Sequence, residues 1–147
     1  MNLEQQLKFE LDPAFESVEE MEPGSAYGVI IINDFYEHFY MSSSWWSLAD
    51  YQRQWQMAFE RLKIGKTACF VVNVQCHTPL IAMWLAYHDG KKIYIQSQYF
   101  FGAYYKQVIG KNSFTPENSF DFIPERETHC EDGDPISEWM IELDNES

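Results

Sequence analysis

Apolar residues recur with the period of an α-helix over residues 48–63, and this pattern constrains the fold more than any other feature of the chain. In a helix with 3.6 residues per turn, positions three, four, seven and eleven apart lie on one face. The segment therefore predicts a helix with one buried stripe. The stripe consists of Leu48, Tyr51, Trp55, Ala58, Phe59 and Leu62.

Sequence signals mark both the start and the end of this helix. Ser47 can cap the first turn, and Asp50 three residues later completes a variant of the capping box and places a negative charge at the positive end of the helix dipole. Gly65 is suited to the left-handed conformation that follows many helices. These signals place the helix at about Leu48 to Lys63.

Strand patterns lie on both sides of the helix. Thr67–Gln75 is rich in β-branched and aromatic residues, and Ile81–His88 and Lys91–Tyr99 are joined by Asp89-Gly90, a strong hairpin signal. Apolar and polar residues alternate in Ile136–Leu143 and between residues 7 and 11, which predicts two further half-buried strands.

Two segments are less regular. Within Tyr27–Trp46, Val29–Ile32 has the pattern of a strand, but the residues after it fit either a strand or a short helix. The glycines and prolines between Phe100 and Pro135 predict long loops with one or two short strands. We therefore predict one α+β domain over residues 1–147. It has a central antiparallel sheet of about five or six strands, packed against one main amphipathic helix, plus long loops.

Charge is concentrated at the two ends of the chain, whose formal net charge is −13. Residues 1–22 hold seven acidic residues and one Lys, and residues 117–147 hold eleven acidic residues and one Arg, whereas residues 23–116 have a net charge of +3. Such patches repel nucleic acid and anionic membranes and attract a cationic partner. We expect a basic protein partner, no direct binding of nucleic acid and no membrane association.

The cysteines and the N-terminus bear on the compartment. Cys69, Cys76 and Cys130 are odd in number and form no CxxC pair, which is typical of a reducing environment. Residues 1–12 lack the basic and apolar regions of a signal peptide, and no apolar run is long enough to span a membrane. We expect a cytoplasmic location.

Signatures of catalysis and of cofactor binding are absent from the sequence. His and Cys residues are adjacent in Cys76-His77 and His129-Cys130 but lack the spacing of zinc ligands, and the acidic run at 131–134 departs from the order of a calcium loop. Phosphate-binding glycine loops and a GxSxG motif do not occur. We therefore expect no catalytic residue, no metal site, no cofactor and no enzymatic activity.

Aromatic residues precede the helix and include Trp45-Trp46. Such rings could stack on nucleic-acid bases, but a single-strand binder also needs a basic groove. Rings beside a helix start more often pack into the core, and we expect that here.

Several of these segments together resemble a known family. The resemblance rests on the run from Trp46 to Trp55, on Arg61–Gly65, on Ile93–Gln96 and on Ile136–Trp139, and covers about residues 35–143. It is to the CdiI-type immunity proteins of bacterial contact-dependent growth inhibition systems. The spacing of Trp46-Ser47, Asp50-Tyr51 and Trp55 approximates the family pattern only in part.

The resemblance implies a cytosolic antidote that binds the toxic C-terminal domain of a delivered effector, often a nuclease, and blocks it without catalysis. The alternative is an acidic adaptor, or a nucleic-acid-mimicking inhibitor, of another basic protein. The family motifs are structural and carry no functional residue over to this chain. The charge pattern fits both functions.

A partner-binding site is expected in the acidic C-terminal segment. Five of its acidic residues fall within ten positions in a region without strand pattern, where side chains reach solvent: Glu125, Glu127, Glu131, Asp132 and Asp134. A purely solubilising role is the alternative for these residues. The aromatic-rich segment Tyr99–Tyr105 is the next candidate for an interface.

Overall fold

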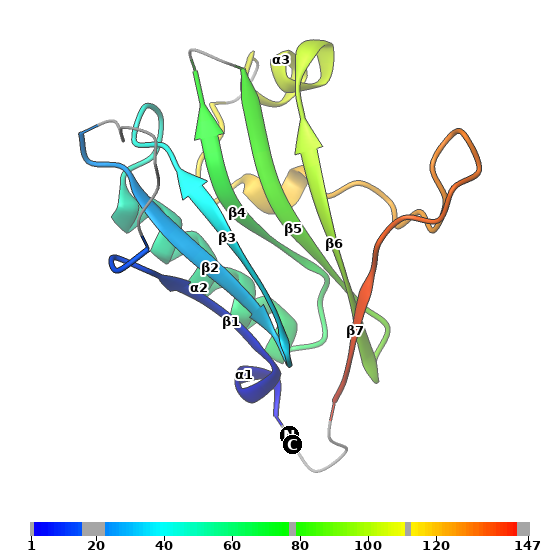
Figure 1. Cartoon of the computed structure of the whole chain (residues 1–147). Helices are drawn as coiled ribbons and strands as arrows, with labels where there is room; N and C mark the ends of the chain where they lie inside the picture. Colours follow the sequence, from blue (N-terminus) through cyan, green and yellow to red (C-terminus); the bar gives the residue numbers. More distant parts are fainter. Residues whose placement is uncertain (1, 16–22, 77–78, 111–112, 144–147) are drawn as a thin grey trace.

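The computed structural model describes residues 2–15, 23–76, 79–110 and 113–143 (Figure 1). The elements follow one another along the chain as α1 (Leu3–Gln6), β1 (Leu7–Leu11), β2 (Ala26–Ile32), β3 (Phe35–Met41), α2 (Leu48–Lys63), β4 (Ala68–Gln75), β5 (Leu80–His88), β6 (Lys92–Phe100), α3 (Gly102–Gly110), the 3-10 helix η1 (Ser119–Phe122) and β7 (Trp139–Glu142). The α+β class predicted from the sequence is confirmed.

The strands form two antiparallel sheets, whereas one central sheet was predicted. The first has the order β1-β2-β3 and the second β4-β5-β6-β7. Most of β2 and all of β3 come from Tyr27–Trp46, whose structure the sequence pattern did not settle. β1 pairs with β2 from Leu7 opposite Ile32 to Leu11 opposite Gly28. Strand patterns give the faces of a strand but not its neighbours, so the division into two sheets could not be predicted.

The second sheet agrees with the sequence pattern along β4, β5 and β6. β5 and β6 are joined at Asp89-Gly90, where the Asp89 carboxylate accepts hydrogen bonds from the backbone N–H groups of Lys91 and Lys92 at 3.0 and 2.7 Å. Gly90 has φ +100°, a conformation that side chains with a Cβ rarely adopt. β7 is shorter than predicted, but its alternation is confirmed, with Ile141 buried between exposed Met140 and Glu142.

Helix α2 begins and ends where the sequence predicts. Ser47 and Asp50 form the reciprocal capping box, and the predicted stripe is buried or partly buried. α2 lies against the inner face of the first sheet and beside β4 (Figure 1). Phe9 of β1 and Phe39 of β3 both contact the Trp55 ring, with centroids 5.8 and 5.9 Å away.

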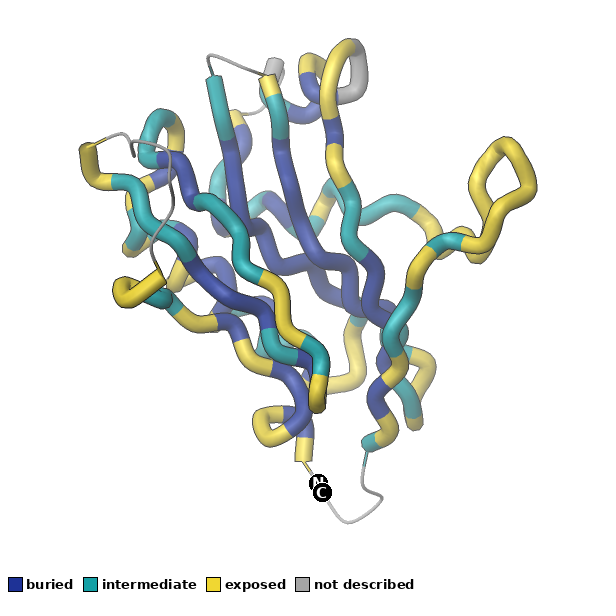
Figure 2. Tube along the Cα trace, in the orientation of Figure 1, coloured by how far each residue is buried: buried dark blue, intermediate teal, exposed yellow. Residues whose placement is uncertain are grey.

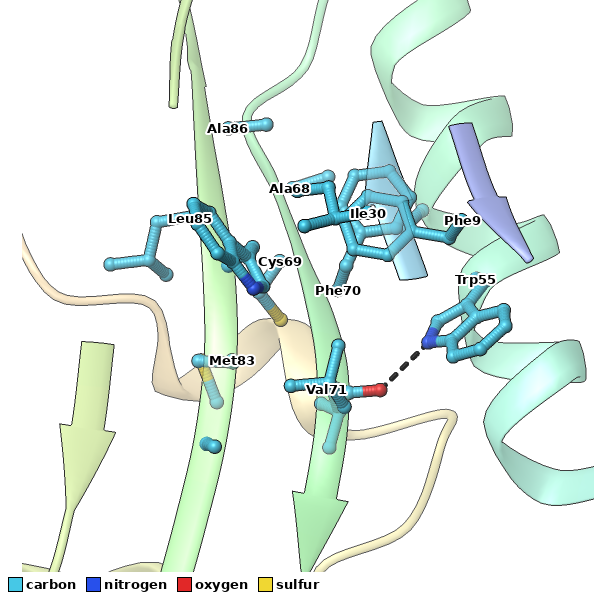
Figure 3. Close-up of a cluster of buried hydrophobic side chains, with 14 of the residues drawn as sticks. Phe9, Ile30, Trp55, Ala68, Cys69, Phe70, Val71, Met83, Leu85 and Ala86 are labelled. Carbon is cyan, nitrogen blue, oxygen red and sulfur yellow. Dashed lines mark hydrogen bonds between the residues drawn. The ribbon is translucent and has the colours of Figure 1, made fainter. Parts of the chain in front are cut away.

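Three polar groups of α2 bind the outer edge of β4. The Trp55 indole N–H donates to the carbonyl of Val71 at 2.7 Å (Figure 3), and the Gln54 side-chain carbonyl accepts from the N–H of Val71 at 2.9 Å. The Tyr51 hydroxyl accepts from the N–H of Val74 at 2.9 Å. These side chains take the place of a neighbouring strand, since unpaired backbone groups in the interior are costly.

Aromatic residues join the two sheets. Phe9 of β1 stacks on Phe70 of β4 with centroids 4.1 Å apart, and Phe35 of β3 lies 4.5 Å from Trp139 of β7. Buried residues follow both sheets and the helix face between them (Figure 2). The core is therefore shared between the sheets.

The structure also corrects the prediction for the segment after β6. α3 occupies part of the region where loops were predicted, and η1 follows it. Glycines at both ends of α3 hid the helix, because glycine normally indicates a break.

The two adjacent tryptophans differ in burial. Trp46 is buried as predicted and stacks on Phe114 at 5.2 Å, while Trp45 keeps 41% of its surface exposed. Both indole N–H groups donate to the carbonyl of Phe114, at 3.1 and 3.0 Å.

Replacing Trp55 by Ala tests the role of α2. The change removes a buried ring and leaves the carbonyl of Val71 without its donor, so we expect a loss of about 3–5 kcal/mol in the free energy of unfolding. Urea unfolding followed by circular dichroism measures it. The control is Gln52→Ala on the exposed side of α2, expected to change stability by less than about 0.5 kcal/mol. A Trp55→Ala protein as stable as this control would contradict the core assignment.

Candidate functional site

The acidic segment predicted from the sequence forms a projecting hairpin. We call residues 125–136 the acidic hairpin. Its two arms are joined by hydrogen bonds from the N–H of Ile136 to the carbonyl of Thr128 and from the N–H of Cys130 to the carbonyl of Asp134, both 2.9 Å. Figure 1 shows it standing away from both sheets beyond β6, and Figure 2 shows its outer part exposed throughout.

All five predicted residues are exposed on this hairpin. Within the described ranges, none of their carboxylates forms an ion pair or a side-chain hydrogen bond; the five are Glu125, Glu127, Glu131, Asp132 and Asp134. Like charges that lack internal partners create a negative potential that extends into solvent. The hairpin can therefore attract a cation or a basic surface.

The one Arg of the hairpin points to the protein instead of neutralising these acids. Its guanidinium forms two hydrogen bonds with the carboxylate of Glu138, at 2.5 and 2.8 Å, and lies 4.0 Å from the centre of the Tyr94 ring. The Gln96 amide donates to the same Glu138 carboxylate at 2.7 Å and to the carbonyl of Glu127 at 2.8 Å. Arg126, Glu138, Gln96 and Tyr94 are called the hairpin anchor below.

The anchor has a clear electrostatic consequence. The hydrogen bond from Arg126 lowers the pKa of the Glu138 carboxyl below its usual value, and the bond from Gln96 acts in the same direction. Glu138 therefore stays ionised and keeps Arg126 engaged at neutral pH. This leaves the five exposed acids uncompensated by Arg126.

A second link fixes the chain just before the hairpin. The Tyr87 hydroxyl of β5 donates to the carbonyl of Pro124 at 2.9 Å. Burial raises the pKa of Tyr87 to about 12, and the nearby Glu127 adds to this shift, so the hydroxyl remains a donor at neutral pH.

An open groove lies between the hairpin and β6 and has a volume of about 550 Å³. Glu125, Glu127 and Glu131 contribute to its wall, whereas Asp132 and Asp134 lie at the tip of the hairpin and do not line it. Tyr99 and Phe101, exposed to 52% and 63%, also line it. The remaining lining residues are Tyr87, Gln96, Gln98, Phe100, Pro124 and Ile136.

The groove combines both sites proposed from the sequence. From the sequence, the acidic segment and the aromatic segment Tyr99–Tyr105 are alternative interfaces. In the structure, three of the acids and the start of the aromatic segment line the same groove. The anchor was missed. The polar residues Gln96 and Gln98, at alternate positions of a strand, are the one signal that could have marked this face of β6.

Metal-binding groups are not assembled in the described part of the chain. It contains no cluster of three or more His, Cys, Asp or Glu residues that could hold a metal ion. Glu138, which follows the acidic run at 131–134, is engaged by Arg126. Cys69 is fully buried, and burial raises the pKa of its thiol to about 12, while His77 lies outside the described residues.

Comparison with known proteins identifies the family. The sequence model of the CdiI N-terminal domain matches residues 41–145. The chain is 31% identical over 120 residues to the immunity protein CdiI of Enterobacter cloacae subsp. cloacae, covering 79% of this chain and 78% of that protein. The chain belongs to the CdiI family of immunity proteins.

A solved structure agrees with this assignment. A chain of the CdiA-CT/CdiI toxin and immunity complex from Enterobacter cloacae superposes with a TM-score of 0.71 at 27% identity, covering 93% of this chain and 90% of that one. The CdiI match begins at the end of β3 and includes α2, the second sheet and the acidic hairpin. The groove therefore lies entirely within the matched region.

The anchor predicts a pH dependence. Because the folded-state pKa of Glu138 is lowered, its interaction with Arg126 contributes fully above the ordinary Glu pKa of about 4.5 and is lost as pH falls through the lowered value. We expect Glu138→Gln to be less stable than the unsubstituted protein at pH 7. The difference should shrink on acidification below about pH 4.5.

Urea unfolding at a series of pH values measures this difference. Glu142→Gln on β7, whose side chain is exposed, is the control. A stability difference for Glu138→Gln that does not change between pH 7 and pH 3 would contradict the assigned role of the ion pair.

Proposed function

We propose that this CdiI family member is an antidote that binds a CdiA-CT toxin domain in the cytoplasm and neutralises it without catalysis. Membership of the family is the observation that carries the proposal. Three further features support it: free Cys69, Cys76 and Cys130, no membrane-crossing helix among the described residues, and an exposed acidic surface.

The proposed binding surface is the acidic hairpin together with the groove. Exposed carboxylates without internal partners are available to a basic protein, and their desolvation on binding breaks no existing ion pair. Exposed aromatic rings such as Tyr99 and Phe101 supply the apolar contacts that fix a complex after charge has brought the partners together.

The charge of this surface favours a nuclease as the toxin. A nuclease must present a basic surface to the phosphates of its substrate. An acidic protein that covers such a surface gains a fast encounter and excludes the nucleic acid by occupying the same charges. The hairpin can therefore act as the competitor of a polyanion.

Growth protection tests the function. We expect the gene that precedes this one to encode a CdiA whose C-terminal domain is the cognate toxin. Expression of that domain in a bacterial host should stop growth, and co-expression of this chain should restore it. A toxin from an unrelated CdiA serves as the specificity control. Failure to bind and protect against the cognate domain would overturn the proposal.

Titration of purified proteins separates binding from catalysis and tests the nuclease assignment. The toxin domain should cleave RNA or DNA, and inhibition should be complete near one immunity protein per toxin. Inhibition by far smaller amounts would indicate an enzymatic antidote. A toxic domain that cleaves neither nucleic acid would overturn the nuclease assignment alone.

Neutralising the five hairpin acids tests the surface. The combined change Glu125→Gln, Glu127→Gln, Glu131→Gln, Asp132→Asn and Asp134→Asn should slow association by about tenfold at low salt and flatten its salt dependence, because charge steering is screened over about 8 Å at physiological ionic strength. The melting temperature should change little, since these side chains have no described internal partner. Stopped-flow association with the toxin domain at low and high salt measures the association rate and its salt dependence.

A matched control removes the same charge elsewhere. Five exposed acids outside the hairpin, three Glu and two Asp, are changed to Gln and Asn: Glu10, Asp34, Glu37, Glu60 and Asp121. The control lowers the overall charge equally but leaves the groove intact. Equal effects of the two variants would show that net charge, rather than the hairpin, controls association.

A further inference from the structure

The upper half of β6 has a free edge. β5 pairs with β6 from Ile93 to Phe100, whereas β7 pairs with it only from Lys92 to Ile95. Beyond Ile95 the chain that leads into β7 turns away to the acidic hairpin (Figure 1). Residues 96–99 therefore have a strand neighbour on one side only within the described part of the chain.

The hydrogen-bonding direction of this edge follows from two bonds at the start of the strand. The carbonyl of Lys91 accepts from Leu143 on the β7 side, and the carbonyl of Lys92 accepts from Asp89 on the β5 side. In an antiparallel sheet the backbone groups of successive residues point to alternate sides. The N–H and carbonyl groups of Ser97 and Tyr99 consequently point to the free edge.

This edge opens into the groove. Tyr99 lines the groove directly, and the acidic hairpin forms its far wall. The carbonyl of Tyr99 accepts one long hydrogen bond of 3.3 Å from the neighbouring Gln98 side chain, which a better placed donor can replace. At about 3.3 Å per residue, the four residues from Gln96 to Tyr99 offer an edge of roughly 13 Å.

We propose that an extended cationic segment of the toxin adds to the free edge of β6, in line with β7. Ser97 and Tyr99 would form the backbone hydrogen bonds. Alternate side chains of the added strand would point to the side of the sheet where Gln96 and Gln98 line the groove with Glu125 and Glu127, which calls for Lys or Arg at those positions. This inference rests on the proposed function and specifies how the same surface holds its partner.

Charge selects this occupant over a second copy of the chain. A free strand edge can also pair with the same edge of another molecule. Two copies would bring their uncompensated hairpin acids together, and the formal net charge of −13 opposes this approach. A cationic strand from the toxin would instead be attracted by the hairpin acids and neutralise their charge.

Residue-resolved hydrogen exchange of the unsubstituted chain, alone and with the cognate CdiA-CT domain, tests the proposal. In the free chain the amides of Ser97 and Tyr99 should exchange faster than those of Gln96 and Gln98, which point to β5. In the complex the amides of Ser97 and Tyr99 should slow by roughly tenfold or more, since each gains a hydrogen bond.

The outcomes separate this inference from the function on which it rests. A complex that forms without slowing these two amides overturns strand addition and leaves the immunity function standing. Absence of a complex overturns both. Protection of both amides in the free chain that rises with its concentration would assign the edge to a second copy and overturn the proposed occupant.

Ser97→Pro provides an independent test. Proline removes the N–H that faces the free edge without removing a hydrogen bond to β5, and its ring obstructs an added strand. We expect the Kd for the toxin to rise roughly tenfold, the effect of one lost backbone hydrogen bond together with obstruction. Ser97→Ala keeps the N–H and should bind within about twofold of the original protein.

Melting temperatures establish that both variants are folded before binding is compared. Equal Kd values for folded Ser97→Pro and Ser97→Ala would overturn strand addition. If Ser97→Pro does not fold, the exchange experiment on the unsubstituted chain gives the decision.

Discussion

The fold depends on how the outer edge of β4 is closed. Trp55, Gln54 and Tyr51 of α2 satisfy the backbone of Val71 and Val74 where another strand would otherwise pair. The register of β4 shifts between Val71 and Asn73, and this shift turns the backbone N–H groups of both Val71 and Val74 toward α2. Because the helix closes this edge, the second sheet extends toward β7, and the partial pairing of β6 with β7 among the described residues lies there, beside the acidic hairpin.

Much of this architecture could be predicted because local patterns determine it. The helix stripe, its capping box and the Asp89-Gly90 turn each depend on residues close together in the chain, and all are confirmed. The number of sheets was predicted wrongly because it depends on which strands meet. Gln54 has a polar side chain and so was omitted from the buried face, yet it is fully buried and bonded to β4.

The candidate site was predictable in part for the same reason. A run of acids in a segment without periodicity identifies an exposed charged loop, and the structure bears out that exposure. The groove required knowledge of three distant segments: Tyr87 of β5, the end of β6 and the hairpin. The pairing of Arg126 with Glu138 was also not predictable, because the chain contains 23 acidic residues and each is a possible partner for Arg126.

The position of the hairpin anchor along the chain has a consequence for when the proposed binding surface forms during synthesis. Arg126 and Glu138 follow α2, β4, β5 and β6 in the sequence, and only β7 lies beyond them among the described elements. A protein emerges from the ribosome from its N-terminus, so both sheets can begin to pack while the hairpin is still unsynthesised. The proposed binding surface is thus completed only after α2 and strands β1 to β6 have been synthesised, and a chain interrupted before Glu138 would lack the hairpin anchor even where those elements pack.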